Sequence, residues 1–131
     1  MPLPKTKRAR MYQLGRWLSK EFPCPYPVSV HVIRKELLRE EDTSGGKAAY
    51  AYGDTYVQDG VIHIRLDRDL DWGTMGETLF HEWGHAVTLR HAKIEARRMQ
   101  RNIHDDEFWL SLGRIWRRFH DENGWAESRE F

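Results

Sequence analysis

The 131-residue chain has little cysteine, no long apolar run and almost no net charge. Its one cysteine, Cys24, cannot form a disulfide within the chain, which excludes a disulfide-stabilised secreted scaffold and fits a reducing compartment. No apolar run reaches the ~20 residues that a membrane-spanning helix needs. Charged residues make up 31% of the chain, yet the formal net charge of +1 argues against a globally basic surface for nucleic acid.

The N-terminus also lacks an apolar stretch behind its basic residues, so we expect no secretory signal and a cytoplasmic location. A chain of 131 residues can build one substantial hydrophobic core but not two. We therefore expect a single domain over residues 1–131. Residues 1–7, which contain two prolines and two lysines, are expected to form a flexible lead.

The segment His81-Glu82-Trp83-Gly84-His85 carries the clearest chemical signal. Residues four apart lie on one face of an α-helix, so the two imidazoles can share one metal ion. Glu82, next to the first histidine, is turned toward the side where a metal-bound water would lie. H-E-x-x-H on a helix is typical of zinc hydrolases, with the glutamate as general base. Two core histidines satisfied by hydrogen bonds are the alternative, and the glutamate between them favours the metal site.

The residues around this motif independently predict a helix. Thr74 and Glu77 fit a capping box, with Thr74 as N-cap. Apolar residues then recur at steps of three and four, at Met75, Leu79, Phe80, Trp83, Ala86, Val87 and Leu89.

The rest of the chain predicts an α+β fold. Residues 8–20 have the apolar spacing of an amphipathic helix, which three prolines between positions 23 and 27 end. Residues 28–34 alternate as a strand, and Asp59-Gly60 is a hairpin signal before a further strand from Val61 to Leu66. A second turn is expected at Gly53-Asp54. The elements predict a small, mainly antiparallel sheet packed on the N-terminal helix and the motif helix, followed by a C-terminal helix.

A catalytic zinc ion usually has three protein ligands and one water, so a third ligand is needed. His91 would match the metzincin spacing, but that pattern has a glycine where this chain has Thr88. If the helix continues, His91 lies about 9 Å further along the axis on another face. His104 is the stronger candidate, because it directly precedes a predicted amphipathic helix that would hold it in place. Glu107, in the first turn of that helix, is the third candidate.

Two other polar residues on predicted strands and turns are given ordinary roles. His63 alternates with apolar residues and is interpreted as a strand histidine rather than a metal ligand. Cys24 lies between two prolines and is interpreted as an unpaired thiol in a rigid turn, not as a zinc ligand.

The combination of His-Glu-Trp-Gly-His and His-Asp-Asp-Glu-Phe-Trp, the latter leading an aromatic-rich helix, resembles the SprT-like zinc metallopeptidases of bacteria and phages. The resemblance covers about residues 60–120. Asp105 stands where that family commonly has glycine, and no four-cysteine zinc ribbon follows, so only the minimal catalytic core is expected. The resemblance implies a zincin-like fold, Zn²⁺ as cofactor, metal ligands at His81, His85 and His104, and Glu82 as the catalytic residue.

Peptide hydrolysis is the expected reaction, with a protein or peptide substrate paired to an edge strand at Val61–Leu66. The alternatives are a non-proteolytic zinc-binding module and a metzincin-like protease that uses His91. Basic residues between Arg90 and Arg101, and Lys5, Lys7, Arg8 and Arg10, form two local positive patches that would suit association with DNA. The resemblance also implies a gene of a phage or another mobile element in a bacterial host.

Overall fold

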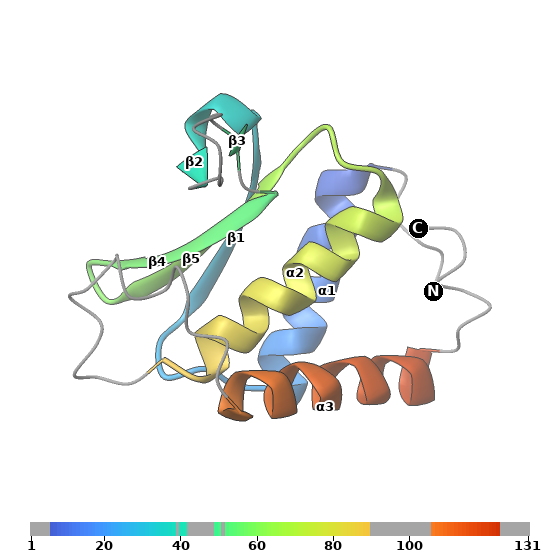
Figure 1. Cartoon of the computed structure of the whole chain (residues 1–131). Helices are drawn as coiled ribbons and strands as arrows, with labels where there is room; N and C mark the ends of the chain where they lie inside the picture. Colours follow the sequence, from blue (N-terminus) through green and yellow to red (C-terminus); the bar gives the residue numbers. More distant parts are fainter. Residues whose placement is uncertain (1–5, 39, 42–48, 51, 90–105, 124–131) are drawn as a thin grey trace.

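The computed structural model describes residues 6–38, 40–41, 49–50, 52–89 and 106–123 and shows an α+β arrangement (Figure 1). Its elements in chain order are α1 (Lys7–Glu21), β1 (Val28–Ile33), the 3₁₀ helix η1 (Lys35–Leu37), β2 (Glu40–Glu41), β3 (Ala49–Tyr50), β4 (Gly53–Gln58), β5 (Val61–Asp67), α2 (Trp72–Val87) and α3 (Asp106–Asn123). Over the described residues, none of these helices combines the length and the apolar character required to span a bilayer.

The first helix confirms the predicted amphipathic segment and corrects its start. The Thr6 side chain accepts a hydrogen bond of 3.1 Å from the Ala9 amide, so Thr6 is the N-cap and Lys7 is the first helical residue. Residues 6 and 7 therefore do not belong to a flexible lead, while residues 1–5 lie outside the described part of the chain.

The main sheet has the order β1-β5-β4 and is mixed rather than mainly antiparallel. β1 pairs with β5 in parallel, from Val28 opposite Ile62 to Ile33 opposite Asp67. β4 pairs with β5 antiparallel, and β2 and β3 form a separate antiparallel pair. The expected edge strand at Val61–Leu66 is wrong, because β5 is paired on both sides and its backbone is already used. Among the described residues, β1 and β4 are the edge strands of this sheet.

The hairpin between β4 and β5 confirms one predicted turn. Asp59 and Gly60 have φ values of 52° and 74°, which is the left-handed pair that a tight hairpin turn of the I′ kind requires. The other predicted turn, at Gly53-Asp54, is wrong, because both residues belong to β4. A Cβ at Gly53 would lie 2.8 Å from both the Arg65 carbonyl oxygen and Cγ2 of Thr78, so glycine permits a close approach between β4 and α2.

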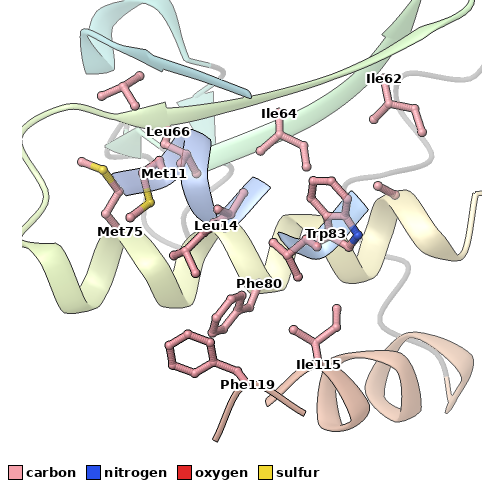
Figure 2. Close-up of a cluster of buried hydrophobic side chains, with 14 residues drawn as sticks. Met11, Leu14, Ile62, Ile64, Leu66, Met75, Phe80, Trp83, Ile115 and Phe119 are labelled. Carbon is pink, nitrogen blue, oxygen red and sulfur yellow. The ribbon is translucent and has the colours of Figure 1, made fainter. Parts of the chain in front are cut away.

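Strand alternation divides the sheet into an inner and an outer face. The inner side chains of β5, Ile62, Ile64 and Leu66, are fully buried and point toward α2 (Figure 2). α2 lies between this sheet and α3, where Phe80 packs with Ile115 and Phe119. α1 completes the core with buried side chains that include Met11, Leu14 and Leu18. The motif helix is thus held on three sides by packed elements.

Candidate metal centre

The helix that carries the motif begins at a different cap from the predicted one. Asp71 is the N-cap, and its Oδ1 accepts a hydrogen bond of 2.7 Å from the Thr74 amide. The bonds from Thr74 lower the pKa of the Asp71 carboxyl. Thr74 therefore lies in the first turn of α2, and the predicted capping box with Glu77 is wrong. The different cap does not alter the prediction that His81 and His85 share one helical face, because the helix continues through Val87.

His81, Glu82 and His85 form a compact group of possible metal ligands. One ligand atom from each lies within 4.8 Å of the other two, and the imidazole centroids are 5.0 Å apart. The His81 side chain is 38% exposed, whereas Glu82 and His85 are buried. The group is therefore open to solvent on the His81 side and enclosed on the His85 side. Two imidazole nitrogens at this spacing can hold a divalent metal ion, with the carboxylate beside them as a further ligand or a base.

Thr55 on β4 fixes the carboxylate of Glu82. The Thr55 hydroxyl donates a hydrogen bond of 2.8 Å to Oε1 of Glu82, and both residues are buried. The other carboxylate oxygen, Oε2, lies 4.0 Å from Nε2 of His81. One carboxylate oxygen of Glu82 therefore contacts the sheet, and the other lies on the metal-binding side of α2. Sequence reasoning missed Thr55, because a threonine on a strand carries no distinctive signal of its own.

Phe108 on α3 encloses the two histidines from the other side. Its ring stacks on His85 at a centroid distance of 4.3 Å and meets His81 edge-on at 5.0 Å. Phe108 has no exposed surface. A Cβ at Gly84 would lie 3.0 Å from Cε1 of Phe108, so the glycine inside the motif makes room for this ring. Packing of this kind holds the imidazole orientations that a shared ion needs.

Trp83 anchors the opposite face of the motif. It is fully buried, and its indole N–H donates a hydrogen bond of 3.0 Å to the backbone carbonyl of Phe22, just after α1. Trp83, which lies between the proposed functional residues, is therefore a core residue that holds α2 against the end of α1.

The structure describes only one of the three candidates for the third ligand. His91 and His104 lie outside the described residues. Glu107 is exposed in the first turn of α3 and is not part of the group that His81, Glu82 and His85 form. His63 is not part of that group either, because it lies on the outer face of the sheet with Tyr56.

Cys24 matches the interpretation as an unpaired thiol. It is half-buried, and burial raises the pKa of its thiol to about 12. A thiol in this state is a poor metal ligand and a poor nucleophile at neutral pH, because both roles require the thiolate.

Comparison of the chain with protein-family models, with curated proteins and with solved structures finds no match.

Proposed function

We propose that this protein is a zinc metallopeptidase with a zincin-like fold, similar to the SprT-like enzymes, in which His81 and His85 hold Zn²⁺ and Glu82 is the general base. One observation carries the proposal: a buried glutamate lies between two imidazoles that share one helical face, and a hydroxyl from the sheet orients its carboxylate. A metal site that serves only stability gains nothing from a carboxylate oriented beside the ion.

His104 is the third ligand in this proposal. It lies two residues before Asp106, where α3 begins. Phe108, in the first turn of α3, contacts both imidazoles of the motif. Two residues of chain span at most about 7 Å, so His104 is tethered close to a helix end that already touches the site. Helix α2 ends at Val87 with Thr88 as its C-cap, so the expectation that a continuing helix carries His91 to another face is wrong. His91 therefore stays the alternative third ligand, and the experiment below distinguishes the two.

The residues of the site divide the chemistry between them. A bound zinc ion would supply Lewis-acid activation of water and of the scissile carbonyl. Glu82 accepts the proton of the attacking water at Oε2, because Oε1 is held by Thr55. Glu82 then donates that proton to the leaving amine, so the peptide C–N bond breaks as the amine departs. Phe108 keeps water away from the His85 side, while substrate enters past the more exposed His81.

The substrate peptide lies along β4 in this proposal. β4 is an edge strand of the sheet, and its residue Thr55 bonds directly to Glu82. An extended peptide that adds to this edge would run beside the catalytic carboxylate and would be bound largely through its backbone. Weak sequence preference is the expected result.

The DNA-binding alternative receives no support from the described residues of the N-terminal patch. Lys7 donates hydrogen bonds to the Arg68 and Leu70 carbonyls, and Arg8 donates to the Val32 carbonyl. The guanidinium of Arg10 lies over the Trp72 ring at 4.1 Å. These cations are engaged within the protein. The second patch, residues 90–101, lies outside the described part of the chain.

The test compares bound zinc and cleavage of unfolded casein across single variants. Glu82→Gln is expected to keep zinc and lose cleavage, whereas His81→Ala, His85→Ala and His104→Ala are expected to lose both. His120→Ala is the matched control, since His120 is an exposed histidine of α3 that stacks on Trp116. If His104→Ala binds zinc normally and His91→Ala does not, the third ligand is His91 rather than His104. Cleavage by Glu82→Gln at the native rate would overturn the proposed mechanism.

A further inference from the structure

Among the described residues, β1 is the edge strand of the sheet that the proposed catalysis does not use. It pairs with β5 on one side, where the Ile62 amide donates a hydrogen bond to the Pro27 carbonyl. Successive residues of a strand direct their backbone groups to opposite sides. The backbone groups of Val28, Val30 and Val32 therefore face away from β5, toward the free edge.

The backbone of this edge is only partly satisfied within the described part of the chain. Arg8 on α1 donates a hydrogen bond of 3.1 Å from its guanidinium to the Val32 carbonyl. The amides and carbonyls of Val28 and Val30 on this side have no hydrogen-bond partner among the described residues. A row of free donors and acceptors along a strand is a template for a further extended chain.

A groove runs along this edge between β1 and α1, which contact each other (Figure 1). Its volume is about 520 Å³, which is in the range of ligand-binding pockets. Residues 28–31 line it from the strand. The opposite wall is formed by four residues on one face of α1, Tyr12, Gly15, Arg16 and Ser19. A Cβ at Gly15 would lie 3.2 Å from Cγ2 of Val30, so the glycine lets the helix lie close beside the strand.

The groove is positively charged. Arg16 is exposed, and within the described part of the chain its guanidinium has no hydrogen bond or ion pair. Lys20, one turn further along α1, is also exposed. None of the described residues that line the groove is acidic. An arginine in this situation is suited to bind a carboxylate through two parallel hydrogen bonds.

We propose that this groove binds an extended, acidic peptide segment of a partner protein, which adds to β1 as a further strand. Val28 and Val30 offer both amide donors and carbonyl acceptors, and another peptide backbone complements both. The phosphates of a nucleic acid offer acceptors only, so they leave the two carbonyls unpaired. An acidic side chain on the α1 side of the added strand pairs with Arg16.

A second copy of this chain is a poorer occupant than an acidic peptide. Pairing β1 with β1 of another copy would place Arg16 and Lys20 of both copies at one interface, where like charges repel. An acidic segment instead brings the opposite charge to the same edge. β5 lies between β1 and β4, so the partner segment and a substrate along β4 are bound without competing for the same backbone.

The experiment measures peptide binding to full-length Glu82→Gln protein, in which the proposed general base is absent and the probe is not consumed. The probe is a short acetylated peptide that alternates glutamate and valine, followed by titration calorimetry. We expect Arg16→Glu to weaken its Kd by about tenfold, because the carboxylates then meet a like charge. Arg114→Glu is the matched control, since Arg114 is an exposed arginine of α3, and it should leave Kd unchanged.

Two peptide controls leave the protein unaltered and therefore decide the question even if Arg16→Glu does not fold. A peptide with lysine in place of glutamate should not bind, because it repels the groove. A peptide with N-methylated backbone amides should not bind, because it cannot pair with β1. Hydrogen exchange should slow at the Val28 and Val30 amides when the acidic peptide is added.

Several results would overturn the proposal. They are native affinity in folded Arg16→Glu, equal binding of the N-methylated peptide, protection on β4 instead of β1, and no binding of the acidic peptide. Tighter binding of single-stranded DNA to this groove would make it a nucleic-acid site, and a dimer that the peptide dissociates would assign the edge to a second copy. None of these results depends on whether the protein is a peptidase.

Discussion

The hydroxyl of Thr55 and Oε1 of Glu82 lie 2.8 Å apart, which connects the edge strand β4 directly to the motif helix α2. The two residues are 27 positions apart in the sequence. The contact depends on Gly53, where the absence of a side chain lets β4 approach Thr78 of α2. The orientation of the proposed general base is therefore set by the sheet rather than by its own helix alone.

Replacing Thr55 by valine tests this relationship. The valine side chain has nearly the same shape but no hydroxyl, so Glu82 loses the donor that orients it. We expect kcat for peptide cleavage to fall by about 10–100-fold, the usual cost of losing such a supporting contact, with KM and bound zinc nearly unchanged. Thr55→Ser, which keeps the hydroxyl, should restore most of the rate. A Thr55→Val enzyme with native kcat would show that the hydrogen bond does not position the base.

Replacing Gly84 by alanine tests the packing of Phe108 over the histidines. The new Cβ would lie 3.0 Å from Cε1 of Phe108, whose ring is fully buried and has little room to shift. Overpacking of this kind costs about 1–3 kcal/mol, against a gain of about 1 kcal/mol in helix propensity. We expect weaker zinc binding and a lower free energy of unfolding in urea.

Gly113→Ala is the matched control for that substitution. Gly113 is also helical, on α3, but apart from its own helix backbone and chain neighbours no atom of the described residues lies within 4 Å of its added Cβ. Alanine there should stabilise the protein by about 0.5–1 kcal/mol and leave zinc affinity unchanged. Equal effects of the two substitutions would argue that Gly84 has no packing role.

The metal-free protein should lose stability as the pH falls below about 6.5, the ordinary histidine value. Burial lowers the pKa of His31, and the charges of His63 and Arg65 lower it further. Arg16, on α1, lines the same cavity as His31 and adds another positive charge nearby. Because the unfolded chain binds a proton at position 31 before the folded protein does, acidification favours unfolding.

Urea denaturation between pH 5 and 8, with a chelator present, measures this dependence. His31→Gln should flatten the profile over the window just below pH 6.5, because glutamine does not titrate. His120→Gln, at an exposed position of α3, is the matched histidine-to-glutamine variant for comparison. A native slope in His31→Gln would assign the pH dependence to other groups.

Cys24 should resist alkylation in the folded protein. Burial raises its thiol pKa to about 12, so almost no thiolate is present at pH 8. Iodoacetamide labelling followed by mass spectrometry should be slow in buffer and fast in denaturant. Rapid labelling of the folded protein would mean that the turn after α1 opens readily.

The sequence was sufficient for features that depend on local patterns. The spacing of Met11, Leu14 and Leu18 predicts α1, Asp59-Gly60 predicts the hairpin, and the apolar steps around His81 predict α2. Each of these signals is read within one or two turns of chain. The helix from Asp106 to Asn123 also agrees with the predicted C-terminal helix.

The errors arose where distant residues decide the outcome. Strand alternation predicts β1 but not that it runs parallel to β5, because the direction of pairing depends on the intervening chain. Asp71 and Thr74 are both suitable caps one turn apart, so composition alone does not choose between them. Gly53 beside Asp54 is typical of a turn, whereas in the structure it lies in β4 and allows the close approach of α2. Thr55 became visible only through its contact with Glu82.

The parallel pairing of β1 with β5 bears on how small the protein can be made. The region with the recognisable motifs, about residues 60–120, contains β5, α2 and most of α3 but lacks α1, β1 and β4. A fragment limited to these residues would lack both strands that pair with β5, would expose Ile62 and Ile64 to water, and would lose the Phe22 carbonyl that accepts the hydrogen bond of the Trp83 indole. The segment that carries the motif residues is consequently not expected to fold on its own. A truncated protein that contains all of these residues but lacks the missing elements should be insoluble.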